Sequence, residues 1–311
     1  SFYLLWKFSP QLPSYDKIVN YKPNLSSRIY SSDGMLLKSF FVEERIFIPI
    51  NRIPKKIIEA FISAEDKNFY NHFGFDLMAI TRALITNVMS YSTNKRVVGA
   101  STITQQVVKN LLLTNEISYE RKIKEILLAI RIENILSKEE ILELYLNDIY
   151  LGFGSYGIGT ASLNYFNKSI YELDIDEIAY LASLPKAPNN YHPVKNYQNA
   201  IERRNWVIDR MYKNGYISEK NLDYKKKSLN TFKRTENYFT KADYYYEEIR
   251  KKLYLLYGKN KLYSDGLIIK TTIDSKIQNF ADQSLLNGIL DYEKSQGWRG
   301  AVHNVINLNL K

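Results

Sequence analysis

The 311-residue sequence contains no cysteine and only three histidines. The absence of cysteine excludes disulfide bonds, zinc–thiolate sites and cysteine nucleophiles, and is compatible with either a reducing or an oxidising compartment. So few histidines also argue against a histidine-rich metal centre. The chemistry of this chain must therefore depend on carboxylates, cations and neutral hydrogen-bonding side chains.

A long hydrophobic run is missing as well. No stretch of eighteen or more apolar residues is present, so we expect no segment of the chain to span a bilayer. Residues 1–8, SFYLLWKF, nevertheless have the aromatic and basic content of the exit from a membrane span. We expect that such a span precedes them in the intact protein, although an ordinary buried first element would read the same way.

Acidic residues are fewer than basic ones, with 33 against 43, which gives a net charge of +10. This surplus favours a polyanion or an anionic bilayer surface as partner, and charge alone does not choose between them. The 26 tyrosines suit interfaces that are half wet and half apolar, although an A/T-rich genome gives the same excess. At roughly 150 residues per domain, the length predicts about two domains.

Helical patterns dominate after an initial hairpin pattern. Residues 28–41 predict two short strands around a turn at 32–34. Apolar spacing and capping residues predict helices over about 54–65, 102–112, 119–136, 137–149, 174–185 and 200–213. We expect the glycines at 152, 154, 157 and 159 to break regular structure. Beyond 218 the sequence is basic and tyrosine-rich, with a strand pattern at 266–273 and a helix pattern at 275–292.

A pair of carboxylates closes the first predicted helix, in the segment EDKNFYNHFGFD (residues 65–76). Glu65 follows an apolar helix face and precedes Phe69 and His72, which is where a partly desolvated general base would lie. Taken alone, a helix end with surface charges explains the same residues.

Two further segments combine neutral donors with positive charge. GASTITQQVVKN (99–110) offers hydroxyl and amide side chains and Lys109 near a helix start, which is typical of a phosphate site but lacks the P-loop spacing. RKIKE (121–125) places Arg121, Lys122 and Glu125 on one helical face, where a surface ion pair worth about 0.3–0.5 kcal/mol would look the same. Segments 138–168 and 181–211 add polar residues that packing alone does not need, which are Asn147, Tyr150, Arg203 and Arg204.

These five segments, in this order and at these separations, resemble the signature motifs of the family 51 glycosyltransferases, the peptidoglycan polymerases found alone or fused to a penicillin-binding transpeptidase. The similarity covers about residues 28–215. Residues 262–278 resemble the stretch that leads into the transpeptidase of the bifunctional, class A type. Ala100 and Asn167 stand where many relatives carry glycine, and neither departure replaces a charged group.

The resemblance implies a mainly α fold: a lysozyme-like glycosyltransferase domain with a short β-hairpin before it and a small α+β linker segment after it. It divides the chain into three parts. These are a membrane-proximal segment at 1–27, the glycosyltransferase domain at 28–217, and a linker with the start of a truncated transpeptidase region at 218–311.

The implied reaction is the polymerisation of lipid II by inverting transfer, in which a sugar 4-hydroxyl attacks the anomeric carbon of a lipid-linked chain and undecaprenyl pyrophosphate leaves. The catalytic carboxylates would be Glu65 and Glu125. No cofactor is required, and Glu125 would also offer a ligand to a divalent cation, magnesium or manganese, near the leaving group. The residues expected to bind substrate are Asp66, Phe69, His72, Thr102, Gln106, Lys109, Asn110, Arg121 and Lys122.

The implied partners are lipid II, the growing lipid-linked glycan and other cell-wall synthesis proteins, with no nucleic acid. The implied location is the inner (cytoplasmic) membrane, spanned once, with the catalytic domain on its periplasmic or extracellular side. The apolar segment 77–91 resembles the membrane-facing region of the family, and the nearby Arg82, Lys95 and Arg96 would reach phosphate headgroups. Apolar residues at this spacing also suit a protein core.

Two other functions account for part of the sequence. A lysozyme-like lytic transglycosylase, which cuts glycan with one glutamate, explains Glu65 but leaves the cations of the second and third segments unused. A non-catalytic scaffold that binds lipid II is disfavoured because both glutamates and the three cations, Lys109, Arg121 and Lys122, are present.

Overall fold

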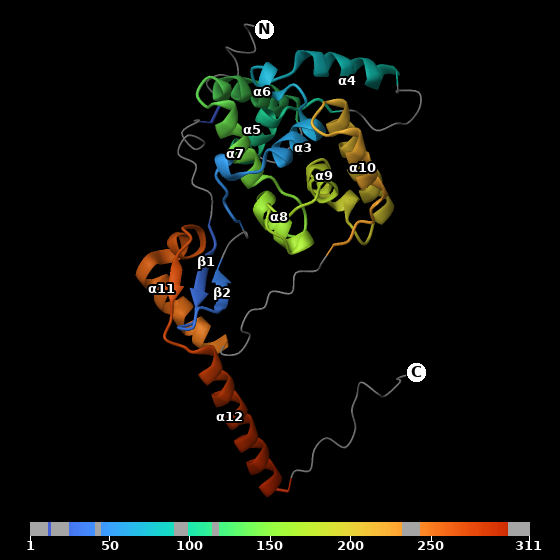
Figure 1. Cartoon of the computed structure of the whole chain (residues 1–311). Helices are drawn as coiled ribbons and strands as arrows, with labels where there is room; N and C mark the ends of the chain where they lie inside the picture. Colours follow the sequence, from blue (N-terminus) through green and yellow to red (C-terminus); the bar gives the residue numbers. More distant parts are fainter. Residues whose placement is uncertain are drawn as a thin grey trace, which may run out of the picture. The chain divides into compact units, whose positions relative to one another are not determined.

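The computed structural model describes residues 12–13, 25–40, 45–89, 99–113, 118–231 and 243–297. They form two compact units, labelled by element in Figure 1. Unit 1 holds the described residues up to 26 and from 45 to 231, and unit 2 holds residues 27–40 and 243–297. Both units are mainly helical, which confirms the predicted fold class.

Unit 1 is built from helices joined by short connections. Its α-helices are α3 (Lys55–Glu65), α4 (Leu77–Met89), α5 (Ile103–Leu112), α6 (Tyr119–Glu133), α7 (Lys138–Asp148), α8 (Gly157–Phe166), α9 (Ile175–Ser183) and α10 (Tyr197–Lys213). Short 3-10 helices lie between or after them, which are η2 (Ile50–Arg52), η3 (Phe69–Asn71), η5 (Pro188–Tyr191) and η6 (Glu219–Lys226).

The helix starts in unit 1 are set locally. Three of the predicted helix starts are confirmed and carry capping boxes, which are Thr102 with Gln105 on α5, Ser137 with Glu140 on α7, and Asp174 with Glu177 on α9. Each box satisfies backbone N–H groups that a helix start would otherwise leave unpaired. Helix α3 packs on α9 and α10, and α5 packs on α6 and α7, around one apolar core.

Helix α8 corrects one prediction, because Gly157 and Gly159 lie inside a helix instead of breaking it. Gly157 opens the helix with φ 76°, and a Cβ there would lie 2.6 Å from the carbonyl oxygen of Asn147. A Cβ on Gly159 would lie 2.9 Å from the carbonyl oxygen of Ile46. These glycines therefore serve close packing of α8 against neighbouring backbone.

Unit 2 is a three-stranded sheet with two helices. Strand β1 (Ser27–Tyr30) pairs antiparallel with β2 (Leu36–Phe40) and parallel with β3 (Ile268–Lys270), in the order β2-β1-β3. Helix α11 (Asp243–Ser264) and helix α12 (Ser275–Ser295) complete the unit. A small core unites the two parts of the chain, made of Ile29, Leu37, Phe40, Tyr246 and Leu262.

Two features of unit 2 differ from the sequence-based expectations. Helix α11 was not predicted, since its tyrosine-rich sequence has no clean amphipathic period and Gly258 interrupts it with φ 77°. The hairpin groups with the C-terminal part of the chain, whereas the prediction placed it in the 28–217 domain, because β3 pairs with β1. The functional boundaries at 27 and 217 stay predictions. In the described part of the chain, no helix combines the length and the apolar character needed to cross a bilayer.

The loop after α3 lies directly on α6 in unit 1. Gly74 has φ 88°, and a Cβ there would lie 2.7 Å from the backbone carbon of Ala129. The carbonyl oxygen of Gly74 accepts a hydrogen bond from Thr102 Oγ1 at 2.7 Å. The loop is therefore held between the start of α5 and the backbone of α6.

This close approach predicts that Gly74→Ala lowers the free energy of unfolding by about 3 kcal/mol or more, through left-handed strain plus overlap with backbone. The matched control is Gly215→Ala, because Gly215 has φ 77° but a Cβ there would meet nothing within 4 Å. The control should lose only about 1–2 kcal/mol. Urea denaturation measures both, and equal losses would contradict the close contact.

Candidate active site

Glu65, the last residue of α3, borders an open pocket of about 170 Å³ in unit 1. The walls of the pocket come from the end of α3, from α4, from residues 99–102 before α5, and from α10. Three cations border the same space, Lys67, Arg82 and Arg210. The carboxylates of Asp66 and Asp76 border it too, so Glu65 faces a solvent-connected space lined by charged side chains of both signs.

The side chain of Glu65 is oriented by a neutral donor. Gln106 Nε2 donates a hydrogen bond to Glu65 Oε2 at 2.9 Å. The hydroxyl of the buried Tyr145 donates in turn to Gln106 Oε1 at 3.5 Å. Because Tyr145 occupies the acceptor atom of the amide, the amide N–H₂ group faces Glu65.

The other oxygen of Glu65 lies near a cation. Arg203 Nη2 is 3.8 Å from Glu65 Oε1, and the two side chains are each 11% exposed. The guanidinium of Arg203 stacks 3.9 Å from the ring centroid of Trp206, and that of Arg210 lies 4.9 Å from the same ring. Trp206 therefore holds Arg203 at the edge of the carboxylate, without a close hydrogen bond between the two charges.

These surroundings shift the proton affinity of Glu65. Removal from water is the largest influence and raises the pKa of Glu65 above its ordinary value. The hydrogen bond from Gln106 and the charges of Arg203 and Lys186 oppose this rise, whereas the charge of Asp66 adds to it. The balance leaves a carboxylate that is more basic than a free one.

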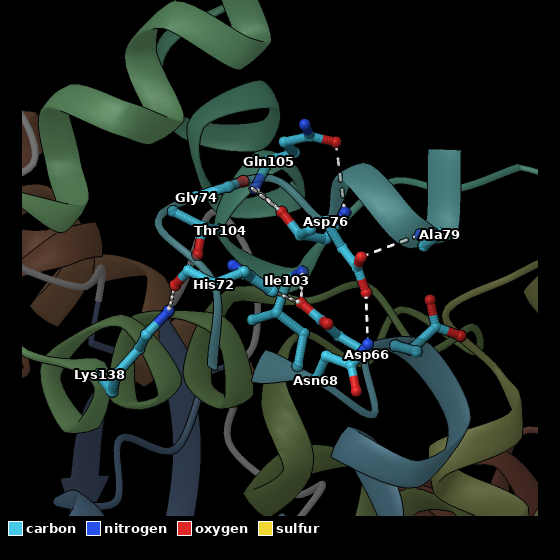
Figure 2. Close-up of polar contacts among 12 residues, drawn as sticks. Asp66, Asn68, His72, Gly74, Asp76, Ala79, Ile103, Thr104, Gln105 and Lys138 are labelled. Atoms are coloured by element: carbon cyan, nitrogen blue, oxygen red, sulfur yellow. Dashed lines mark hydrogen bonds and ion pairs between the residues drawn. The ribbon is translucent and has the colours of Figure 1, made fainter. Parts of the chain in front are cut away.

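Asp66, the next residue, has entirely different surroundings, which Figure 2 shows. Its Oδ2 accepts a hydrogen bond from the backbone N–H of Ile103 at 3.0 Å and lies 2.9 Å from His72 Nε2. Ile103 is the first residue of α5, where a helix dipole favours negative charge. Asp66 thereby fastens the end of α3 to the start of α5 and brings Glu65 next to Gln106.

A second layer of polar contacts holds the loop that carries His72 (Figure 2). Lys138 Nζ donates to the carbonyl oxygen of His72 and to Glu133, each at 2.7 Å. It also lies 4.5 Å from the ring centroid of Phe69, which is fully buried. Neither Phe69 nor His72 lines the pocket, whereas Asp66 and Thr102 do.

The second predicted carboxylate, Glu125, is buried on α6 among cations. Arg121 Nη1 donates to its Oε1, and Lys122 Nζ donates to its Oε2 at 2.7 Å, so the predicted helical face is present. Glu125 is only 3% exposed. Lys122 Nζ also donates to Ser101 Oγ at 2.8 Å, and Ser101 lines the pocket that Glu65 borders.

The remaining predicted site residues lie further along α5. Lys109 is exposed one turn after Gln106 and makes no ion pair with any residue that the structure describes. Asn110 is exposed and borders a different, small pocket beside α7. The structure therefore brings Gln106 to Glu65 but does not bring Asn110 there.

A resident divalent cation has no ready ligand set here. Both carboxylate oxygens of Glu125 are already engaged by Arg121 and Lys122. Among the described residues, no group of three or more histidine, aspartate or glutamate side chains could hold a metal ion. Glu125 could therefore bind a metal only if its ion pair with Arg121 or Lys122 opened. A metal requirement remains a prediction.

Sequence reasoning missed part of the surroundings of Glu65. Arg203 was noted as a residue that packing does not need, but nothing in a linear sequence joined it to Glu65. Trp206 and Lys186 lie in the same segment, 181–211, but no sequence pattern marks them as neighbours of Glu65. Tyr145 belongs to the apolar spacing of the helix predicted at 137–149 and is buried, but its hydroxyl also donates a hydrogen bond to Gln106.

Comparison with known proteins identifies the family of this chain. A protein-family model described as "Transglycosylase" matches residues 33–212. Penicillin-binding protein 1A of Rickettsia prowazekii (strain Madrid E) is 45% identical over 308 residues, which is 97% of this chain and 39% of that protein. The corresponding protein of Escherichia coli (strain K12) is 40% identical over 302 residues, covering 96% of this chain and 35% of that protein.

The fold is similar to that of a solved relative. The crystal structure of penicillin-binding protein 1A from Haemophilus influenzae matches with a TM-score of 0.50 and 26% sequence identity, over 94% of this chain and 33% of that chain. The chain thus spans well under half the length of these relatives. Since the family model matches more than half of the 311 residues, the chain belongs to the transglycosylase family, as its five motifs predict.

Proposed function

We propose that this chain is a peptidoglycan glycosyltransferase that polymerises lipid II by inverting transfer, with release of undecaprenyl pyrophosphate. The observation that carries the proposal is the carboxylate of Glu65, which is largely removed from water at the wall of an open pocket lined by charged side chains. Membership of the transglycosylase family supports the same chemistry.

Glu65 is the proposed general base. The attacking 4-hydroxyl must lose its proton as the new glycosidic bond forms, and a carboxylate of raised pKa accepts that proton more readily. Gln106 holds one oxygen of Glu65, and the other is 3.8 Å from Arg203, beyond close hydrogen-bonding range. That oxygen is the one that we assign to the proton transfer.

The leaving pyrophosphate needs preorganised positive charge, because negative charge builds up on it in the transition state. Lys109 is exposed, and Arg121 and Lys122 are fixed by their ion pairs with Glu125. We therefore assign Glu125 the task of holding these two cations in place. The lytic alternative would leave all three cations without a role.

Four of the predicted substrate-binding residues are better explained as supports, given their burial. Thr102 caps α5, Asp66 and His72 join two helix ends, and Phe69 packs beneath Lys138. We propose that they act on the substrate through the positions of Glu65 and Gln106. The reaction itself requires no cofactor.

Helix α4 supports the proposed contact with lipid. Six of its apolar side chains are exposed by between 59% and 77%, and these residues are Leu77, Met78, Leu84, Ile85, Val88 and Met89. Ala83 is the one buried residue of this helix. Arg82, also on this helix, is exposed. A core helix would not leave such a face open, so we propose that α4 lies in the outer leaflet of the cytoplasmic membrane. Lys95 and Arg96 lie outside the described residues.

The base assignment predicts that Glu65→Gln lowers the rate of lipid II polymerisation by about 10² to 10⁴, because general-base catalysis contributes roughly that factor. The amide keeps the shape and the hydrogen bond to Gln106 but accepts no proton. Polymer formed from labelled lipid II in detergent measures the rate, and circular dichroism confirms folding. A folded variant of near wild-type rate would remove Glu65 as the base.

The contact with Arg203 predicts a shift in pH dependence. Activity should be lost as pH falls through the pKa of Glu65, since the base must be ionised. Arg203→Gln removes a charge that lowers this pKa, so the acidic limb of kcat/KM should move to higher pH. Arg210→Gln is the matched control, because Arg210 stacks on the same ring and should leave the limb in place. Identical limbs in the two variants would contradict the assignment.

The leaving-group assignment predicts that Lys109→Met or Arg121→Met lowers kcat by about 10²-fold or more, with a smaller change in substrate binding. Glu125→Gln should also slow turnover while keeping the acidic limb of the wild type. Lys220→Met, on the exposed η6 helix, controls for the loss of one charge. If Lys109→Met and Arg121→Met both turned over lipid II like this control, the pyrophosphate would have to be bound elsewhere.

A further inference from the structure

The turn between α7 and α8 holds a phenylalanine in an unfavourable backbone conformation. Phe153 has φ 50°, between Gly152 at φ 85° and Gly154 at φ 66°. A left-handed conformation is uncommon for any residue with a side chain and is a genuine outlier for a bulky one. Among the described residues outside glycine, only Asn167 shares it, and asparagine tolerates it well.

The rest of the turn is built to enforce this conformation. Leu151 N–H donates to the carbonyl oxygen of Ser155 at 2.9 Å, and Ser155 N–H donates to that of Gly152 at 2.8 Å. The buried Tyr165 donates its hydroxyl to the carbonyl oxygen of Leu151 at 2.7 Å. A Cβ on Gly152 would lie 2.6 Å from that hydroxyl, so the turn closes tightly on Tyr165. Phe153 is therefore held at the tip.

Burial of the ring does not offset the free-energy cost of this backbone conformation, because Phe153 remains 52% exposed. Its ring centroid lies 5.0 Å from that of Tyr165 and 4.8 Å from that of His192. We call these three residues the aromatic platform. A strained residue that leaves an apolar surface open is better explained by a ligand than by the fold.

The platform borders the segment of chain that carries Lys186. The charge of Lys186 acts on Glu65, as described above. Two residues further on, the side chain of Pro188 would contact a Cβ on Gly152 at 3.3 Å. The segment then passes through η5 to His192, which contacts Phe153. A molecule that follows residues 186–192 away from Glu65 would thus reach the platform.

We propose that the aromatic platform binds a pyranose ring of the growing glycan strand by stacking on Phe153. This proposal rests on the proposed function. Sugar rings present a face of C–H groups, which gain from contact with an aromatic ring, and an uncharged ring suits a glycan better than a phosphate. Such a contact tolerates any sugar of the strand and lets the strand advance between cycles. It retains the polymer rather than assisting bond formation.

The test compares Phe153→Gly with Phe153→Tyr in the polymerisation of labelled lipid II, with product lengths separated by gel electrophoresis. Phe153→Gly removes the ring and relieves the strain, so its midpoint of thermal unfolding should stay within about 3 °C of the wild type. Its mean product length should fall by about 5-fold, as expected for loss of roughly 1 kcal/mol of ring contact. Phe153→Tyr should keep the wild-type length.

The control is Tyr171→Ala, which removes another exposed aromatic side chain and should leave product length unchanged. The initial rate of Tyr171→Ala on lipid II should match that of the wild type. A folded Phe153→Gly that makes strands of wild-type length would overturn the platform, as would equal shortening by Tyr171→Ala. If the wild-type chain makes no polymer at all, the proposed function fails instead, and the two failures are thereby distinguished.

Discussion

The arrangement of the active site depends on the buried carboxylate of Asp66. A charge removed from water is costly unless hydrogen bonds compensate it, and here the compensation comes from the first backbone N–H of α5 and from His72. Because Ile103 is 37 residues from Asp66 and His72 lies in the loop that follows it, Asp66 joins the end of α3, that loop and the start of α5. Glu65 and Gln106 are brought together by this junction.

The same junction gives two adjacent carboxylates different surroundings. Asp66 accepts a hydrogen bond from the first backbone N–H of α5 and lies against His72, whereas Glu65 has one neutral donor, a cation 3.8 Å away and little water. Neighbouring groups with such different environments are suited to different tasks. The pair therefore divides two tasks, since Asp66 holds the helices and Glu65 is the residue that we propose as the base.

Local rules explain what the sequence could predict. The capping boxes and the face shared by Arg121, Lys122 and Glu125 involve residues three or four apart, so a linear pattern contains them. The contact between Glu65 and Arg203 joins residues at opposite ends of the domain, and no pattern records it. The sequence does not predict helix α8 for a related reason. Its glycines are needed because the backbone of Asn147 and Ile46, distant in the sequence, leaves no room for a Cβ.

Exposure is the property that helical periodicity cannot reveal. The apolar spacing of α4 is the same for a core helix and for a helix that faces lipid, and only the position of the rest of unit 1 decides which residues are covered. Phe153 is a second case, where a strained backbone and an open ring coincide. Since natural sequences are otherwise consistent from local structure to packing, departures of this kind mark surfaces that a binding partner completes. For α4 the partner that we propose is an apolar phase, whereas the open face of the Phe153 ring matches a ligand only one ring wide.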